Sequence, residues 1–314
     1  MSDSTTLPKP ALSFAEACDR GKVRQENQDS VRNVSTPMGE LVMVADGIGG
    51  YRGGGAASRI VVESFASSIS SQPPNGSPAL AIAEASASAN AHIREAAESG
   101  DPAFRHMGST VVMALITTQA GSAQAWIGHI GDSRAYLSRS GRLTRLTRDH
   151  STVQALMDQN VITAEQARTH PDASVLTRSL GHQPEVEIEV SMTDLEDGDT
   201  LLLCTDGLWG FVSPEAIENV VLDPQADVGD IARELLNLAL EAGGPDNIGI
   251  EVARYATPAA PEPPVFELVY DEQPPRRRTT ATTLLIFILV IAGGALLGWF
   301  AARTHLIPEF HLPH

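Results

Sequence analysis

The chain is poor in lysine: its 314 residues include only Lys9 and Lys22, so arginine supplies nearly all of the positive charge. A phosphate-binding loop of the Gly-x-x-x-x-Gly-Lys-Ser/Thr type needs a lysine farther along the chain, and is therefore excluded. Positive charge as a whole is scarce, because the net charge is -17. Nucleic acid as the main partner is excluded as well, since phosphate backbones require basic patches.

Cysteine is nearly absent, and so are the signals of several other classes. The two cysteines, Cys18 and Cys204, cannot form a disulfide framework in a chain this long, which indicates a reducing compartment. The N-terminus, MSDSTTLPKP, lacks the apolar core of a secretory signal. The nine histidines show no zinc-site spacing. A dinucleotide-binding fingerprint in the glycine-rich stretch would need glycine at position 52, where Arg52 stands.

One long hydrophobic run lies near the C-terminus, at residues 284–302. Its 19 uncharged residues are enough to cross a bilayer as a helix. Three arginines precede it and one follows, which places its N-terminal side in the cytoplasm. We therefore expect a single-pass protein of the cell (inner) membrane, although a buried core helix is the alternative. The expected parts are a Pro-rich and acidic tether with Arg276, Arg277 and Arg278 (256–282), a transmembrane helix (283–302) and a short tail (303–314).

Gly294 and Gly298 lie four residues apart in this run, and Ala302 continues the stripe of small residues. Such spacing lets two membrane helices approach closely, so it favours a weak homodimer. Glycine is also common in membrane helices that do not associate, and a plain anchor is the alternative.

The rest of the chain, residues 10–255, contains many short strand-like segments and fewer helical ones. Thr163 with Gln166 predicts a capping box, and Ser213 before Pro214 predicts another helix start. The strands come in pairs instead of alternating with helices, so we expect an α+β fold: a β-sandwich of two antiparallel sheets flanked by α-helices. The strand-like segments are 12–19, 30–35, 40–46, 109–118, 123–132, 134–139, 186–192, 200–206 and 247–255, and the helical ones are 55–69, 78–99, 163–168, 213–221 and 227–244.

Aspartates end or follow several of the apolar runs, next to a glycine or a turn. Carboxylates that converge at one rim of a sheet repel one another and are costly to bury. A divalent cation removes the repulsion, and oxygen-only ligands indicate Mg²⁺ or Mn²⁺. The Gly47 carbonyl is a further candidate ligand, because glycine leaves room for a close approach; the alternative is that DGIGG is only a tight turn. The aspartates are Asp46, Asp132, Asp206 and Asp246, with Asp29 in a fifth stretch.

Seven motifs occur in the order of one known family. They resemble the metal-dependent Ser/Thr protein phosphatases of type 2C, most closely the compact bacterial members. The resemblance covers the whole body and implies the family's β-sandwich flanked by helices, with a mobile flap at about 150–180. The motifs are GKVRQENQDS, VADGIGG, GSTVVMALI, HIGDSRAYL, RDHS with VLTRSLG, LLLCTDGLWG and GGPDNIGI.

The resemblance also implies a set of metal ligands. Asp46 would bridge two ions, and the Gly47 carbonyl would bind the second of them. Asp206 and Asp246 would complete the first ion, and Asp132 with Asp206 would form a third, weaker site. The alternative for Asp132 is that it only caps a turn and pairs with the nearby arginine.

Other roles follow from the same resemblance. Arg24 would hold the substrate phosphate, and Asp29 would orient a water on the metal. Gln28 replaces the family's usual glutamate and removes a charge near the second ion. Ile48 replaces the histidine that eukaryotic members carry, so no side chain is assigned as general acid. His129, Asp149 and His150 are interpreted as structural.

The expected reaction is hydrolysis of phospho-Ser and phospho-Thr in proteins by water that two ions activate, with Mn²⁺ or Mg²⁺ as cofactor. The expected partners are phosphoproteins and an opposing Ser/Thr protein kinase. The alternative is a catalytically weak or silent phosphatase-like membrane scaffold or sensor. Silent relatives usually lose metal-binding aspartates, whereas this chain keeps all four.

Overall fold

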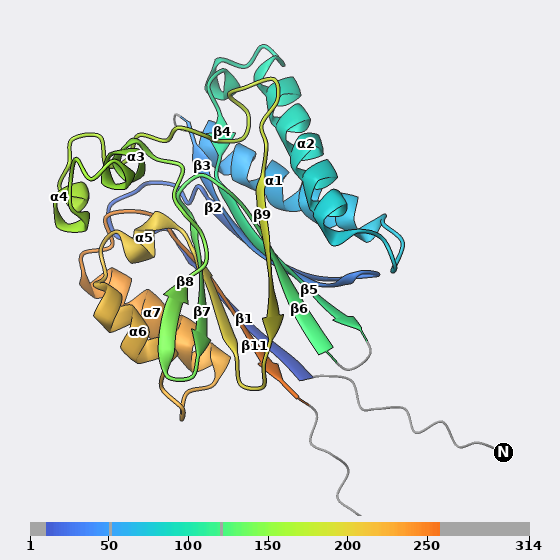
Figure 1. The fold of residues 1–314 in the computed structure, drawn as a ribbon. Coiled ribbons are helices and arrows are strands. Elements are labelled where there is room, and N and C mark those ends of the chain that lie inside the picture. Colours follow the sequence, from blue (N-terminus) through green and yellow to red (C-terminus); the bar gives the residue numbers. More distant parts are fainter. Residues whose placement is uncertain (1–10, 50–51, 120–121, 258–314) are drawn as a thin grey trace, which may run out of the picture. The chain divides into compact units, whose positions relative to one another are not determined.

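The apolar and β-branched runs form strands that pair antiparallel throughout. The computed structural model describes residues 11–49, 52–119 and 122–257 (Figure 1). Within them the strands are β1 (Ala11–Asp19), β2 (Asp29–Thr36), β3 (Gly39–Ile48), β4 (Gly108–Ser109), β5 (Val111–Gln119), β6 (Ser122–Ile130), β7 (Arg134–Arg139), β8 (Arg142–Arg145), β9 (Glu189–Leu195), β10 (Thr200–Cys204) and β11 (Ile248–Ala256).

The helices begin at polar caps where the sequence supplies them. Thr163 and Gln166 form the predicted capping box of α4, and Ser213 caps α6 with Pro214 in its first turn, so both predictions are confirmed. The described helices are α1 (Gly53–Ser70), α2 (Pro78–Ala97), α3 (Thr152–Asp158), α4 (Ala164–Arg168), α5 (Asp206–Trp209), α6 (Pro214–Val221) and α7 (Val228–Glu241), with a 3₁₀ turn η1 (Pro102–Phe104).

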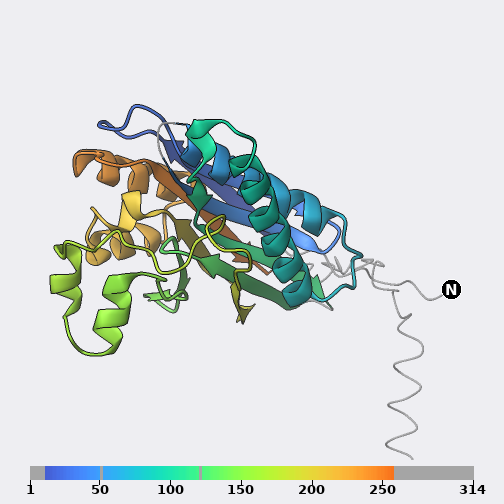
Figure 2. The same ribbon diagram turned by 90° about the horizontal axis from the view of Figure 1, so that it is seen from above.

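Two sheets pack face to face with helices on both outer sides (Figures 1 and 2). One sheet has the order β1-β11-β10-β7-β8, and the other has the order β2-β3-β5-β6-β9 with β4 beside β3. A core of residues such as Val44, Val112 and Leu203 fills the space between the sheets. Two further cores lie under α1 and α2 on one side and under α6 and α7 on the other. The expected sandwich of antiparallel sheets flanked by helices is confirmed.

Some elements differ from the sequence prediction. The strand expected at 186–192 is β9, which begins later because its partner β6 pairs with residues 189–195. Asp206 is not the end of a strand but the first residue of the short helix α5. The strand β8 and the helix α3 were not expected; Ser151 caps α3, a start signal that the prediction overlooked.

No helix among the described residues is long and apolar enough to cross a membrane. The predicted transmembrane helix, its Gly294 and Gly298, the tail and nearly all of the tether lie outside the described residues. The described part belongs to a compact unit, Met1–Ala260. The predicted boundaries at 255 and 283 remain predictions.

Candidate active site

Asp46 and Asp29 lie side by side on two neighbouring strands. Asp46, near the end of β3, is the register partner of Asp29, the first residue of β2. Asp29 is buried, and its Oδ2 accepts a 2.7 Å hydrogen bond from the Thr205 hydroxyl. The Asp46 amide donates to Thr110 Oγ1 at 3.0 Å, and the Thr110 amide donates to the Asp46 carbonyl at 2.9 Å. Both carboxylates are thus held at the same end of the β2–β3 pair.

The other predicted aspartates reach this place from turns and from a helix start. Asp206 follows β10 directly and opens α5. Asp246 lies two residues before β11. Asp132 is buried in the turn between β6 and β7. Strand ends of both sheets therefore bring the five predicted carboxylates together at one end of the sandwich.

The carboxylates are close enough to shift one another's pKa values. Burial raises the pKa of Asp46 well above its ordinary value, and the charges of the other four aspartates raise it further. Burial raises the pKa of Asp29 to about 8, against the hydrogen bond from Thr205. Burial and the charge of Asp246 raise the pKa of Asp206 to about 6, and burial with the charge of Asp206 raises that of Asp132. Buried carboxylates that repel one another are an oxygen donor set that fits hard divalent cations such as Mn²⁺ or Mg²⁺.

The Gly47 carbonyl lies against the first turn of α1. A Cβ on Gly54 would stand 2.5 Å from the Gly47 oxygen, and a Cβ on Gly47 would stand 2.0 Å from the Gly54 oxygen. Two glycines are therefore required for this close approach. Gln28 lies at the same spot: its carbonyl accepts from the Gly47 amide at 3.1 Å, and its side-chain amide carbon is 2.7 Å from the Cβ position of Gly54.

Arg24 lies at the rim of the aspartate cluster. Its Nη2 is 2.7 Å from Oδ2 of Asp246, and its side chain is 51% exposed. The predicted phosphate-binding residue is therefore beside a predicted metal ligand, and it has the freedom to turn toward solvent.

Comparison with known proteins identifies the family of this fold and site. Residues 20–239 match the family model described as Protein phosphatase 2C. The chain belongs to the protein phosphatase 2C family. The serine/threonine protein phosphatase PstP of Mycobacterium tuberculosis is 39% identical over 243 residues, which are 77% of this chain and 45% of PstP. The chain thus spans about half the length of that relative. The protein phosphatase PhpP of Streptococcus pneumoniae is 34% identical over 236 residues, 74% of this chain and 93% of PhpP.

Solved structures of the 2C family agree with this fold. One is the catalytic domain of PstP in complex with 2 manganese ions. Its match to this chain covers 79% of this chain and 100% of the PstP domain, at 36% sequence identity and a TM-score of 0.69. Another is the serine/threonine phosphatase of S. agalactiae. Its match covers 77% of this chain and 99% of the S. agalactiae chain, at 30% sequence identity and a TM-score of 0.71. Manganese in the PstP domain agrees with the predicted cofactor, Mn²⁺ or Mg²⁺.

Two residues of this 2C site were not predicted from the sequence. Thr205 bridges the sheets: its hydroxyl donates to Asp29 and accepts from the Gly249 amide at 2.8 Å. Asn247, also buried, holds residues 20–28 in place through three hydrogen bonds. Its Nδ2 donates to the carbonyls of residues 20 and 26, and its Oδ1 accepts from the amide of residue 28. Thr205 precedes Asp206 and Asn247 follows Asp246 in the sequence. This position next to a predicted aspartate is the one signal that could have pointed to them.

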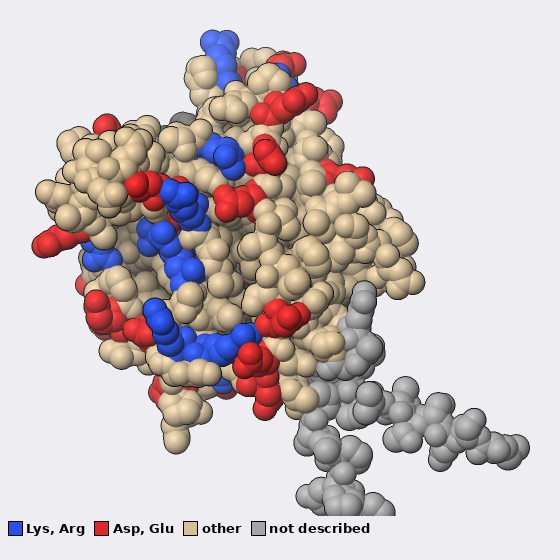
Figure 3. Space-filling model, in the orientation of Figure 1, with Lys and Arg blue, Asp and Glu red and all other residues tan. Residues whose placement is uncertain are grey.

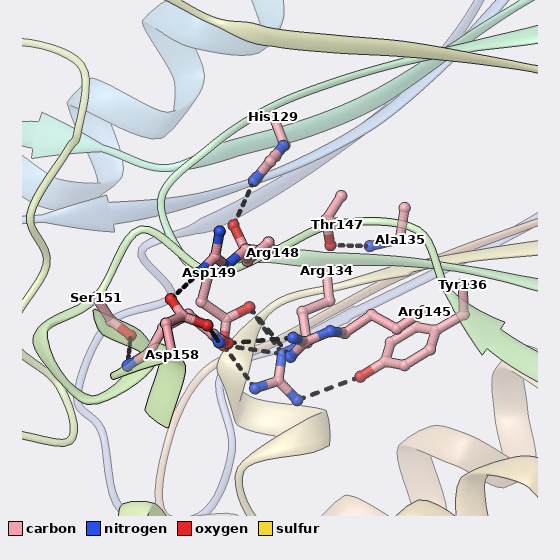
Figure 4. A network of polar contacts seen from close by, with 11 residues as sticks. His129, Arg134, Ala135, Tyr136, Arg145, Thr147, Arg148, Asp149, Ser151 and Asp158 are labelled. Atoms are coloured by element: carbon pink, nitrogen blue, oxygen red, sulfur yellow. Dashed lines mark hydrogen bonds and ion pairs between the residues drawn. The ribbon is translucent and has the colours of Figure 1, made fainter. Parts of the chain in front are cut away.

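Arg134 forms its ion pair with Asp149. A pair between Asp132 and this arginine was the alternative to metal binding. Arg134 Nη2 is 2.6 Å from Asp149 Oδ2, and Arg134 Nε is 3.0 Å from Asp149 Oδ1 (Figure 4). The alternative in which Asp132 pairs with Arg134 is therefore not seen among the described residues, because the guanidinium is turned toward the buried Asp149. This leaves Asp132 with the aspartates, and the ion pair with Arg134 is consistent with the interpretation of Asp149 as structural.

His129, His150 and Glu189 form another group with metal-ligand chemistry. Their ligand atoms lie within 4.8 Å of one another. The Gly131 amide donates to His150 Nδ1 at 3.1 Å, and His150 Nε2 lies 3.2 Å from Glu189 Oε2. Arg178 Nη1, 3.2 Å from the same nitrogen, adds a charge that repels cations. These three residues therefore form polar contacts between the start of the 150–180 segment and β9. The aspartates remain the better metal site.

Proposed function

We propose that this chain is a metal-dependent protein serine/threonine phosphatase. It hydrolyses phospho-Ser and phospho-Thr, with Mn²⁺ or Mg²⁺ as cofactor. The observation that carries the proposal is the convergence of five aspartates on the ends of both sheets, where four of them have pKa values raised by burial and by one another's charges. Family membership and the similarity to PstP and PhpP support it.

The metal ligands would come from four separate segments of the chain. Asp46, the Gly47 carbonyl, Asp206 and Asp246 would hold two ions, and Asp132 with Asp206 would hold a third. When bound, the ions supply a hydroxide nucleophile near neutral pH and stabilise the charge of the phosphate.

The remaining residues of the site would bind and orient the reactants. Arg24 has a planar fork of donors that matches two phosphate oxygens, and its exposed side chain can leave Asp246 to reach them. Asp29 is held beside Asp46 by the Thr205 hydroxyl, and there it would orient a reacting water. These two residues thus position the phosphate and the water relative to each other.

The test is hydrolysis of p-nitrophenyl phosphate and of a phosphothreonine peptide in Mn²⁺. We expect activity that EDTA abolishes, and a loss of about 100-fold or more in kcat for Asp206→Asn, since metal-assisted activation of water carries the reaction. Asp223→Asn, an exposed aspartate after α6, is the matched control and should keep activity. Turnover that persists in EDTA or in Asp206→Asn would contradict the two-ion mechanism. A chain without any Mn²⁺-dependent activity would favour the silent scaffold.

We also propose that residues 283–302 anchor this phosphatase in the inner membrane, with the body in the cytoplasm opposing a Ser/Thr kinase. The 19 uncharged residues and the flanking arginines support this. Membrane fractionation of the chain with and without residues 283–314 tests the anchor, and recovery of the full chain in the soluble fraction would contradict it.

Cross-linking in membranes tests the weak homodimer. The double variant Gly294→Ile with Gly298→Ile should abolish the cross-linked dimer, and undiminished cross-linking would show a plain anchor.

A further inference from the structure

A small pocket opens between the β7–β8 hairpin, the α5–α6 segment and the helix α4. Its volume is about 160 Å³, below the roughly 300–1,000 Å³ of small-molecule sites, so it has room for one side chain. Apolar and aromatic groups of Tyr136, Leu143, Trp209 and Ile217 line it, and Arg145 and Arg168 contribute positive charge. The pocket also holds one carboxylate, that of Glu218, whose Oε1 accepts a 3.0 Å hydrogen bond from the Leu143 amide. We call it the arginine-rimmed pocket.

The charge of this pocket is unusual for so acidic a chain. Lys and Arg side chains gather over the region of β7, β8 and α4 in Figure 3. Arg134, which also lines the pocket, is fixed: it forms the ion pair with Asp149, and its guanidinium carbon stands 3.4 Å from the centroid of the Trp209 ring. Its charge is therefore largely neutralised inside the wall.

The other two arginines keep capacity for an anion. Arg145 has only a long 3.6 Å contact to the already paired Asp149 and a hydrogen bond to Gln154, and Figure 4 shows its side chain reaching toward Asp149 from β8. Arg168 is exposed, and no ion pair or hydrogen bond of its side chain is found among the described residues.

The pocket is joined to the candidate active site through two short stretches of backbone. Arg134 follows Asp132 by two residues, and Trp209 ends the four-residue helix that Asp206 begins. Arg168, the last residue of α4, brings the 150–180 segment to the same pocket. A protein segment with its phosphoresidue at the aspartates would therefore pass within reach of the pocket with a neighbouring side chain.

We propose that the arginine-rimmed pocket binds a glutamate side chain of the phosphoprotein substrate, close in sequence to the phosphoresidue. The methylene groups would pack on Tyr136 and Trp209, and the carboxylate would meet Arg145 and Arg168. The pocket would thus select acidic phosphorylation sites and tie the 150–180 segment to the body when substrate is bound. This inference rests on the proposed phosphatase function.

The test uses the full-length chain in Mn²⁺ with a set of phosphothreonine peptides. A single glutamate is placed at each position from four residues before to four after the phosphothreonine, in an otherwise alanine-rich peptide. At one position at least, glutamate should raise kcat/KM about fivefold over alanine, the effect of a favourable charge pair at a partly exposed site. Arg168→Gln and Arg145→Gln should reduce this ratio toward one, whereas Arg142→Gln, on the same hairpin but outside the pocket, should leave it unchanged.

Two results would overturn the proposal. Hydrolysis of p-nitrophenyl phosphate, which has no glutamate, shows in each case whether the chain is an active phosphatase. A ratio near one at every position, with normal hydrolysis of p-nitrophenyl phosphate, would exclude the pocket alone. A glutamate preference that survives in Arg168→Gln and Arg145→Gln would place its origin elsewhere. A chain that hydrolyses neither the peptides nor p-nitrophenyl phosphate would overturn both proposals.

Discussion

Glu251 is a carboxyl group in the interior of the sandwich. It lies on β11 beside Glu16 of β1 and is fully buried, and its two oxygens have no hydrogen-bond partner among the described residues. Burial, and then the charge of Glu16, raise the pKa of Glu251 from 4.5 to about 9. The side chain is therefore neutral at pH 7 in the folded protein but ionised in the unfolded chain.

This difference makes the free energy of unfolding fall as the pH rises from about 5 to about 9. The folded state binds one more proton than the unfolded state in this window, so stability is lost as the pH rises, by about 1.4 kcal/mol per pH unit at most. Glu251→Gln should remove this contribution. Urea unfolding of both proteins in EDTA at pH 6 and pH 8 measures it, and equal slopes against pH would contradict the prediction.

Asn247 is expected to matter for both stability and substrate binding. Asn247→Ala leaves the carbonyls of residues 20 and 26 and the amide of residue 28 without their partner, which should cost about 1–3 kcal/mol. The freed loop carries Arg24, so KM for p-nitrophenyl phosphate should rise more than kcat falls. Thermal unfolding and steady-state kinetics measure the two effects. The exposed Asn219→Ala on α6 is the control, and a normal KM in Asn247→Ala would make this residue purely structural.

Residues of the candidate site could be predicted where the signal lies in the local sequence. An aspartate that ends an apolar run is visible in the sequence, and the five that were predicted do lie together. Thr205 and Asn247 were not predictable in this way, because each is defined by hydrogen bonds to backbone or carboxyl groups far away in the chain. The direction of Arg134 toward Asp149 instead of Asp132 depends likewise on a nonlocal contact.

At the scale of elements, α4 depends on its cap. It is only five residues long and mostly exposed, and Thr163 and Gln166 supply its capping box. Thr163→Ala should destabilise this helix by about 0.5–2 kcal/mol without lowering the global melting temperature. Hydrogen exchange should show faster exchange at residues 164–168 and unchanged exchange in α7. Unchanged exchange in α4 would mean that contacts outside the cap hold it.

Strong periodic patterns predicted most elements, and weak ones were missed for physical reasons. The buried strands β3, β5, β10 and β11 carry long apolar runs, so both sheets could be anticipated. The strand β8 is Arg-Leu-Thr-Arg with one half-buried apolar residue, and it exists because it pairs with β7. The edge strand β9 is mostly exposed, so its bounds come from pairing with β6 and not from its own pattern.

For the whole molecule, metal binding should stabilise the fold. Ions bound by Asp46, Asp206 and Asp246 would join segments of both sheets, and a ligand at 100 times its Kd adds about 2.7 kcal/mol to the free energy of unfolding. We expect Mn²⁺ to raise the melting temperature by about 5–10 °C in a body of this size. Asp206→Asn should show a smaller rise. Equal melting temperatures in Mn²⁺ and EDTA would exclude tight metal binding by the folded chain.

The layered architecture could be predicted, but the strand order could not. Paired strands with few helices indicate a sandwich, whichever strands are neighbours. That β11 pairs with β1 on one side depends on contacts between residues more than 200 positions apart, such as Ala11 with Ala256. Local pattern carries no information on such pairings.

The same β1–β11 pair has a consequence for the connectivity of the body. Because Ala11 faces Ala256 across the two strands, the two ends of the body leave it side by side, while Asp19 and Ile248 mark the other end of the pair, nearest Asp246. A short linker could join residues 11 and 256, and the chain could be opened at the exposed Ser140–Gly141 turn between β7 and β8. Such a circular permutant would keep every strand pairing and all five aspartates in place, since exposed turns and adjacent ends are where proteins tolerate this change.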